Sequence, residues 1–177
     1  AQIEARLLML SSQNLLKPAD GEPVIMMDPK DIVLGAYFLT KVKFSDAEKT
    51  DRRFSSTAEA RAAYESGKLT LHQPVKVRIA GEIVDTTAGR IIFNDVLPDS
   101  MEFINRNIDK ADIKRIAGEV HRHLGNRQTA EAVDRMKSLG YQWATLSGVS
   151  VAVDDVVVPK QKDEIIGEAM GEVDKVK

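Results

Sequence analysis

Cysteine is the first thing this sequence lacks: none occurs among its 177 residues. A disulfide framework and a thiolate metal site are therefore excluded. The chain also has no apolar run near the ~20 residues that a membrane-spanning helix needs. Nor is one sign of charge dominant, because 25 Lys and Arg residues nearly balance 27 Asp and Glu residues. Since free-standing nucleic-acid-binding proteins are usually clearly basic, this balance disfavours that class.

A self-contained catalytic motif is also missing. His121 and His123 lie about 200° apart around a helix, whereas a helical zinc pair is spaced i, i+4. Asp154 and Asp155 are adjacent, so their side chains point to opposite faces of an extended chain and rarely bind one cation together. We interpret them as a solvated turn. No Gly-rich phosphate loop and no Ser-His-Asp arrangement stands out, so the residues predict no metal site and no complete active site.

The first hundred residues contain a mixture of short elements. Each is bounded by turn residues, by Pro at a first helical position, or by a Ser or Thr cap followed by a glycine stop. We expect helices over 1–10, 28–40 and 56–66, the last capped by Ser56, strands over 24–26 and 74–84, and a loop or hairpin over 42–54. Gly81 is expected to turn or bulge the second strand. Residues 86–98 suit either a short helix ended by Pro98 or a strand, and we favour the helix. Val75, Val77 and Ile79 alternate with charged residues, which indicates a strand with one buried face.

The second part begins with two helical patterns in tandem. Asp109 is a cap for the first, which Gly125 ends, and Thr129 is a cap for the second, which Gly140 ends. Because only four residues join the two patterns, we expect an antiparallel hairpin over residues 110–139. The apolar positions predicted to face one another are Ile113, Ile116, Val120, Leu124, Val133, Met136 and Leu139.

Residues 144–159, ATLSGVSVAVDDVVVP, are unusual because a valine-rich stretch carries two acids and ends at a proline. A buried strand disfavours the acids, and a surface loop disfavours the valines. A charged helix follows to the end of the chain. With short mixed strands and helices first, then a helical hairpin, a loop and a terminal helix, the predicted fold class is α+β. Since both ends of the sequence have helical patterns, we expect a piece of a longer chain.

Two sets of basic residues have alternative interpretations. Lys110, Lys114, His121 and Arg122 lie near one face of the first hairpin helix, opposite its apolar stripe. They form either a solvated face or a docking surface for an acidic partner or a charged ligand. Arg90 follows a glycine and either pairs within the protein or contacts a phosphate.

Four stretches, in this order and spacing, resemble the β′ subunit of bacterial DNA-directed RNA polymerase. They are EARLLMLSSQNLLKPADGEPVIMMDPKDIVLGAYFLT, LHQPVKVRI, DTTAGRIIFNDVLP and GYQWATLSGVSVAVDDVVVP. The resemblance extends over essentially the whole chain, although residues 42–56 match poorly. It implies a part in DNA-dependent RNA synthesis by a cytoplasmic, nucleoid-associated enzyme without a membrane segment.

The resemblance also implies a division of the chain. Residues 1–100 are similar to the pore, or secondary-channel, region and residues 101–177 to the funnel region. The hairpin resembles the rim helices, and residues 144–159 resemble the F-loop, which packs beside the bridge helix and trigger loop. On this basis Asn14 and Arg90 are candidates to face the channel through which nucleotides pass and the RNA 3′ end is extruded. The F-loop-like support would comprise Ser147, Gly148, Val149, Val151, Asp154 and Asp155.

One departure from the family limits the predicted activity. The signature Asn-Ala-Asp-Phe-Asp-Gly-Asp, which carries the family's Mg²⁺-binding aspartates, does not occur here. The resemblance therefore implies no catalysis by this chain alone and a structural role in an enzyme whose Mg²⁺ is bound elsewhere. Implied partners are the rest of β′, the β, α and ω subunits, DNA template and RNA. The alternative is a protein-binding module on which the rim-like hairpin receives secondary-channel regulators such as Gre-type factors. An independent small enzyme is disfavoured.

Overall fold

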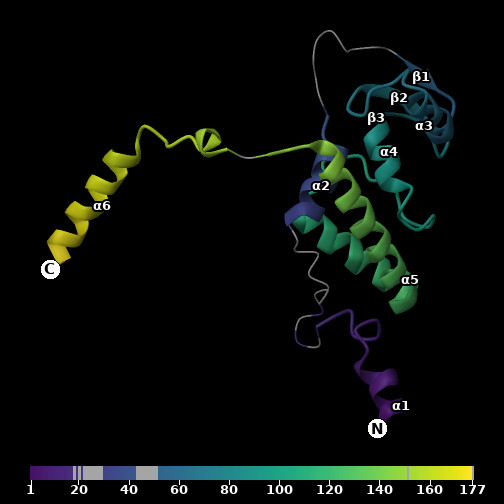
Figure 1. Cartoon of the computed structure of the whole chain (residues 1–177), viewed down its shortest axis with the longest axis horizontal. Coiled ribbons are helices and arrows are strands. Elements are labelled where there is room, and N and C mark those ends of the chain that lie inside the picture. Colours follow the sequence, from purple (N-terminus) through teal and green to yellow (C-terminus); the bar gives the residue numbers. More distant parts are fainter. Residues whose placement is uncertain (18, 20, 22–29, 43–51, 151, 177) are drawn as a thin grey trace.

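A computed structural model describes residues 1–177 except 18, 20, 22–29, 43–51, 151 and 177. Its folded body is a small sheet with helices, and a segment at each end of the chain projects away from that body (Figure 1). The mixture of helices with a three-stranded sheet confirms the predicted α+β class. The strand expected over 24–26, the helix start at Asp28-Pro29 and most of the loop expected over 42–54 lie outside the described residues.

The sheet consists of β1 (Arg53–Phe54), β2 (Pro74–Ile79) and β3 (Glu82–Thr87), in that order. The single strand expected over 74–84 is thus a hairpin, because Ala80 and Gly81 both have positive φ, 49° and 94°, and turn the chain. β2 pairs antiparallel with β3 and parallel with β1. Val75 and Val77 are buried, as the alternation predicted.

Helix α3 (Thr57–Glu65) packs against this sheet and has the predicted cap. Ser56 Oγ accepts a hydrogen bond from the Glu59 amide at 3.2 Å. The Glu59 carboxylate accepts from the amide and hydroxyl of Ser55, at 2.7 and 2.6 Å, rather than from the Ser56 amide. These hydrogen bonds from Ser55 lower the pKa of Glu59. A small core lies beneath α3, and its buried members are Ala60, Leu69, Val75, Val77, Ala88 and Ile91.

Helix α4 (Ala88–Asn94) resolves the stretch whose pattern suited either a helix or a strand. Thr87 caps it by accepting a hydrogen bond from the Arg90 amide at 3.3 Å. The helix ends at Asn94 instead of continuing to Pro98. Ile91 belongs to the core under the sheet, whereas Phe93 belongs to a larger core on the helical side. α4 therefore joins the two cores.

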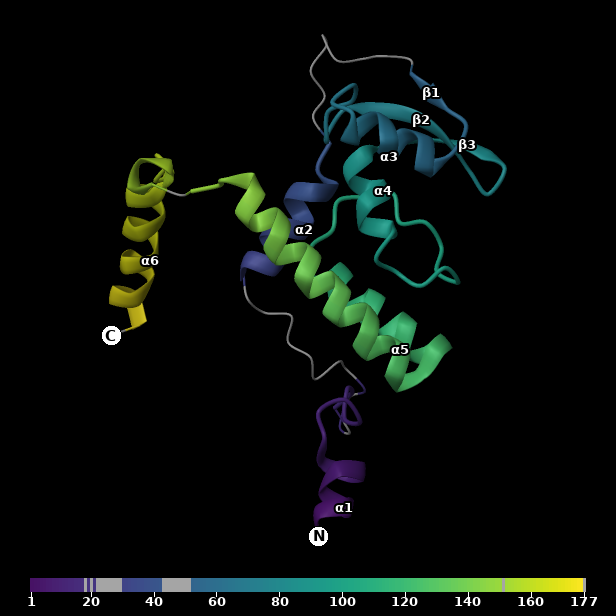
Figure 2. The ribbon, with the colours of Figure 1, turned by 45° about the vertical axis from the view of Figure 1, so that its right-hand side comes forward.

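Helix α5 (Lys110–Ser147) is the predicted hairpin. Gly125, with φ 73° and ψ −177°, breaks the helix so that a second arm folds back along the first (Figure 2). Asp109 and Asp112 form a capping box at its start, which confirms the Asp109 cap. The prediction of a four-residue connection was wrong, because the second arm is helical directly after Gly125. Thr129 is consequently a buried helical residue whose hydroxyl donates to the Gly125 carbonyl at 2.8 Å.

Gly140 was wrongly predicted to end the second arm, which continues to Ser147. The glycine instead faces α2 (Lys30–Thr40). A Cβ at Gly140 would lie 2.7 Å from Ile32 Cγ2 and 2.8 Å from the Ile32 carbonyl oxygen. A Cβ at Gly35 would lie only 1.9 Å from the Gly140 carbonyl oxygen. The two helix backbones therefore touch at a pair of glycines, and neither position has room for a side chain.

The larger core surrounds this contact and draws on both halves of the sequence. It buries the predicted hairpin positions except Leu124, which is partly buried. Its buried members are Ile32, Ala36, Leu39, Phe93, Leu97, Ile108, Ile113, Ile116, Ala117, Val120, Ala132, Val133, Met136, Leu139 and Trp143. The boundary expected near residue 100 consequently does not separate two cores. The assignment of residues 1–100 and 101–177 to a pore and a funnel region stays a prediction.

The projecting ends are short and helical. At the N-terminus, α1 (Gln2–Glu4) runs into a π-helical turn, η1 (Ala5–Met9), in place of one helix over 1–10. At the C-terminus, α6 (Lys162–Val176) is the expected charged helix. Among the described residues no helix is both long and apolar enough to span a membrane.

Substitution of Gly140 tests the glycine contact, with Gly118 as the matched control on the other arm of α5. Gly140→Ala should lower the free energy of unfolding by about 1–3 kcal/mol, because the methyl group overlaps Ile32. Gly118→Ala should raise it by up to ~1 kcal/mol, because no atom lies within 4 Å of the new Cβ and alanine favours a helix. Urea denaturation of both variants gives these values. Equal effects would contradict the contact.

Candidate functional site

Residues 148–158, here called the valine segment, follow directly on α5. The loop expected from residue 144 starts later, because α5 continues through Ser147 and ends at Gly148, which has a left-handed φ of 59°. Ser147 Oγ donates to the Ala144 carbonyl at 2.7 Å and accepts from the Val149 amide at 3.3 Å. The first four residues of the expected loop therefore form the last helical turn, and Ser147 and Gly148 cap it.

The two acids of the valine segment form a local turn. Asp154 and Asp155 lie in a short 3-10 helix, η3 (Val153–Asp155). The Asp155 carboxylate accepts a hydrogen bond from the Ala152 amide at 2.8 Å, and both acids are exposed. This geometry supports the interpretation as a solvated turn. Val151 lies outside the described residues.

The valine side chains of this segment are exposed to solvent. Val153 is 89% exposed and Val157 is 84% exposed, and Val149, Val156 and Val158 are exposed too. Full burial of a valine is worth about 1.5–3 kcal/mol. The segment therefore offers a large apolar surface that no described part of the chain covers.

Two further segments share this property. In α1 and η1 the exposed side chains are Ile3, Leu7, Leu8 and Met9. In α6, Ile166, Met170 and Val173 recur at i, i+4 and i+7, which is the spacing of one helix face, and all are exposed. Contiguous exposed apolar surfaces of this kind mark interaction sites. Each projecting end of the chain is thus a candidate interaction surface.

The predicted docking residues lie on the first arm of α5, on a hairpin that forms the centre of the larger core. Lys110 and Lys114 each have an interaction partner within the chain. His121 Nε2 lies 2.6 Å from Asn126 Oδ1 at the hairpin turn. Arg122 is exposed. The four residues do not form a free basic face, and their role in docking stays a prediction.

Arg90 is held inside the protein. Its Nε donates to the Thr40 carbonyl at 3.1 Å, its Nη1 donates to both Asn105 oxygens at 3.2 and 2.9 Å, and its Nη2 donates to Asn107 Oδ1 at 3.1 Å. Burial lowers the pKa of Arg90. Pairing within the protein is therefore the better interpretation, although the partners are carbonyl and amide oxygens and no acid among the described residues takes part.

Asn14 closes the N-terminal turn. Its Nδ2 donates to the Leu8 carbonyl at 2.7 Å and to the Leu10 carbonyl at 3.2 Å. Beside it, Asn126 Nδ2 donates to the Gln13 carbonyl at 3.1 Å, which joins the N-terminal segment to the turn of the α5 hairpin. Exposure of Asn14 or Arg90 to a channel stays a prediction.

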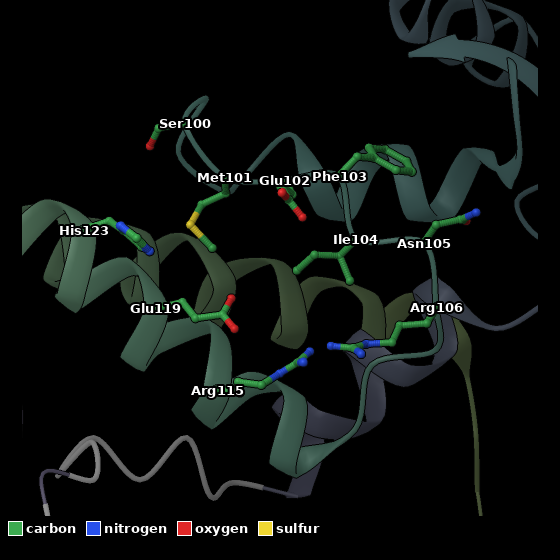
Figure 3. Close-up of a pocket in the computed structure, with 10 residues that line it drawn as sticks. All are labelled: Ser100, Met101, Glu102, Phe103, Ile104, Asn105, Arg106, Arg115, Glu119 and His123. Atoms are coloured by element: carbon green, nitrogen blue, oxygen red, sulfur yellow. The ribbon is translucent and has the colours of Figure 1, made fainter. Parts of the chain in front are cut away.

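A hollow of about 600 Å³ lies between residues 100–106 and the first arm of α5 (Figure 3). Met101, Phe103 and Ile104 supply its apolar lining. Its polar lining consists of Ser100, Glu102, Asn105, Arg106, Arg115, Glu119 and His123. Sequence reasoning missed this hollow, because it depends on where the segment 100–106 is placed in three dimensions.

Asp112 organises one end of the hollow. Its Oδ1 accepts from Arg106 Nη2 at 2.9 Å and from Arg115 Nη2 at 3.0 Å. Asp112 also forms the capping box with Asp109, whose Oδ1 accepts from the Asp112 amide at 2.8 Å. One carboxylate thus serves a helix cap and two guanidinium groups. The available sequence signal was a pair of arginines flanking an acid in the first helical turn.

The described residues hold no group of three or more His, Cys, Asp or Glu side chains with the geometry of a metal site. The described residues thus form a packed body with three exposed apolar segments and a polar hollow.

Comparison with known proteins identifies the family. Residues 14–156 match the protein family described as RNA polymerase Rpb1, domain 3. This chain belongs to that family. The matched residues cover the folded body, including the hairpin, and most of the valine segment.

The relatives are subunits of one enzyme. DNA-directed RNA polymerase subunit beta' of Sulfurihydrogenibium sp. (strain YO3AOP1) is 43% identical over 99% of this chain and 11% of that protein. The subunit of the same name from Desulforudis audaxviator is 42% identical over 99% of this chain and 15% of that protein. That from Aquifex aeolicus is 36% identical over 99% of this chain and 11% of that protein. The chain thus spans only a small part of the length of the relatives it matches.

Arg90 provides a test of the internal network. Arg90→Met should lower the free energy of unfolding by about 1–3 kcal/mol, because it leaves the Thr40 carbonyl and the two asparagines without their donor. Arg78→Met, at an exposed position of β2, is the matched control and should change stability by less than ~0.5 kcal/mol. Denaturant unfolding measures both. If the two variants are equally stable, the network contributes nothing to folding.

Proposed function

We propose that this chain is a segment of the beta' subunit of a bacterial DNA-directed RNA polymerase and serves DNA-dependent RNA synthesis as a packed structural part of that enzyme. The observation that carries the proposal is identity of 42–43% to such subunits over 99% of the chain. The alignments extend over the folded body and both projecting ends.

The exposed apolar segments support a role inside a larger protein. The N-terminal segment, the valine segment and α6 leave large apolar side chains uncovered among the described residues. Exposing such surfaces to water is unfavourable in free energy. They are typical of interfaces that another polypeptide covers. A segment of a large subunit has polypeptide on several sides, which accounts for all three surfaces at once.

In this proposal the chain has no catalysis of its own. The aspartate signature that binds Mg²⁺ in the family is absent from the sequence. Phosphoryl-transfer enzymes depend on such metal ions for stabilisation of the developing charge. Mg²⁺ ligands from outside this chain would supply that chemistry in the assembled enzyme.

The finer proposal is that the chain helps to shape the secondary channel, and that the valine segment supports moving catalytic elements. Two features of the valine segment favour a role in supporting moving catalytic elements over a role in binding a ligand. The side chains of the segment are largely apolar, and its acids are turn residues, one of them hydrogen bonded to the backbone. The cap at Ser147 and Gly148 joins the segment directly to the end of α5. The resemblance to the F-loop implies the bridge helix and trigger loop as its contacts.

Docking of regulators such as Gre-type factors is a second candidate function, and one observation bears on where it would occur. The α5 hairpin is the core of the module, with its apolar positions packed on α2. α6 projects from the body (Figure 2), and its exposed apolar face is already accounted for by other polypeptide of the same subunit. A docking role would therefore fall to the exposed polar face of the hairpin.

Replacement of valines in the valine segment tests the support role. Because Val157 is 84% exposed, Val157→Ser should change the unfolding free energy of the chain by less than ~0.5 kcal/mol. Built into a reconstituted polymerase, the same change should slow nucleotide addition without abolishing it, because gating is impaired while the metal site is intact. Single-turnover nucleotide addition measures the effect.

The matched control is Ile83→Ser, at an exposed position of β3 away from the three apolar segments. It should leave the rate of nucleotide addition unchanged. A normal rate for Val157→Ser would show that the valine segment supports nothing. A loss as severe as removal of a Mg²⁺ ligand would require a direct catalytic role in place of support.

A further inference from the structure

Helix α6 is not covered by any described part of the chain. Every residue described from Gln161 to Lys175 is exposed, and the helix stands apart from the folded body in both ribbon views (Figure 1, Figure 2). Its 15 residues are marginal for a helix that is isolated in water. Gly167 and Gly171 lower its intrinsic helix propensity further. A helix of this kind depends on packing of its apolar face for most of its stability.

The apolar face of α6, here called the α6 face, is a continuous band. It comprises Ile165, Ile166, Ala169, Met170 and Val173. Because successive residues of a helix are ~100° apart, these side chains fall within about 140° of its circumference. The four larger ones are 48% to 63% exposed. Surface helices bury apolar bands of similar width against a protein core.

Acids border the α6 face on both sides. Glu164, Glu168 and Glu172 recur at i, i+4 and i+8 along one border, and Asp163 and Asp174 lie along the other. With only two lysines from Lys162 to Val176, the helix has a net charge of −3. Asp163 and Glu164 complement the helix dipole in the first turn, but Asp174 opposes it in the last turn. The stability of the helix itself therefore does not account for the acids near its end.

The two acidic borders select the charge of a helical partner. In paired helices, the charged residues beside the apolar seam meet those of the partner and set partner choice and orientation. A second copy of α6 would bring acids against acids on both borders in either orientation, which is unfavourable. A helix with Lys or Arg beside its apolar residues would place opposite charges there. The pattern thus disfavours self-association and favours a basic partner.

We propose that the α6 face binds an amphipathic helix whose apolar residues are flanked by Lys or Arg, so that α6 is one half of a two-helix pair. The source of the partner helix rests on the proposed function: the relatives are much longer than this chain, which covers 11% and 15% of two of them, and the helix comes from the rest of such a subunit. The requirement for an apolar seam with basic borders depends only on the residues of α6.

Titration of the ¹⁵N-labelled 177-residue chain with two helical peptides tests the inference by NMR. The basic peptide consists of three repeats of Lys-Ile-Ala-Ala-Leu-Lys-Gln, and its acidic twin has Glu in place of every Lys. The basic peptide should shift the amide signals of α6 in a saturable way. The acidic twin should bind about tenfold more weakly or worse, because its borders repel those of α6. Added salt should weaken binding of the basic peptide.

Charge reversal and loss of apolar surface locate the contact. The double variant Glu168→Lys, Glu172→Lys should reverse the preference and bind the acidic twin more tightly than the basic peptide. Met170→Ser should weaken the basic peptide about tenfold, because it removes apolar surface from the seam. The matched controls are Glu82→Lys and Ile83→Ser, at exposed positions of β3, and both should bind like the unmodified chain. Amide spectra of each variant check the fold.

The remaining outcomes overturn the proposal. Equal binding of the two peptides, or an unchanged preference in the double variant, would show that the acidic borders do not choose the partner. Dimerisation of the chain through α6, seen by sedimentation without peptide, would make a second copy the occupant. Absence of saturable binding would leave α6 as a solvated helix. None of these results bears on polymerase activity, so failure here is distinct from failure of the proposed function.

Discussion

The contact between the backbones of α2 and α5 is the constraint on which the rest of the structure depends. Gly35 and Gly140 face one another, and a methyl group at either position would overlap the opposite helix. Close approach of this kind allows side chains on both sides of the contact to interdigitate at interior density. The larger core forms around it and includes residues from Ile32 to Trp143. A third glycine, Gly89, brings α4 equally close to the Leu39 carbonyl at the end of α2.

Polar groups at the end of α2 complete this arrangement. The buried Thr40 hydroxyl donates to the Ala36 carbonyl at 2.8 Å and accepts from the Ile108 amide at 2.9 Å. The Thr40 carbonyl accepts from Arg90. These bonds connect α2 with α4 and with the start of α5. This packing sets where α5 ends, and so sets where the valine segment begins and where Arg106 and Arg115 converge.

Local patterns predicted much of this fold, and tertiary packing decided the rest. The Ser56 and Asp109 caps, the alternation of Val75 and Val77 and the apolar stripes of the hairpin are set by neighbouring residues, and they were confirmed. The prediction that Gly140 ends the second arm was wrong, because a glycine at a helix end and a glycine at a contact between helices have the same local sequence pattern. The exposed acids at Asp154 and Asp155 were recognised as a turn. The arginine pair was missed because Arg106 approaches Arg115 only once residues 100–106 pack beside α5.

Hydrogen exchange of the Gly35→Ala chain is the most direct measurement of this central contact. The account predicts that amides of α2 and of both arms of α5 lose protection together, because the added methyl group separates the helices. Amides of α3, β2 and β3, around the smaller core, should keep more of their protection. Unchanged protection in α2 and α5 would show that the methyl group is accommodated, and would contradict the claim that the two backbones touch.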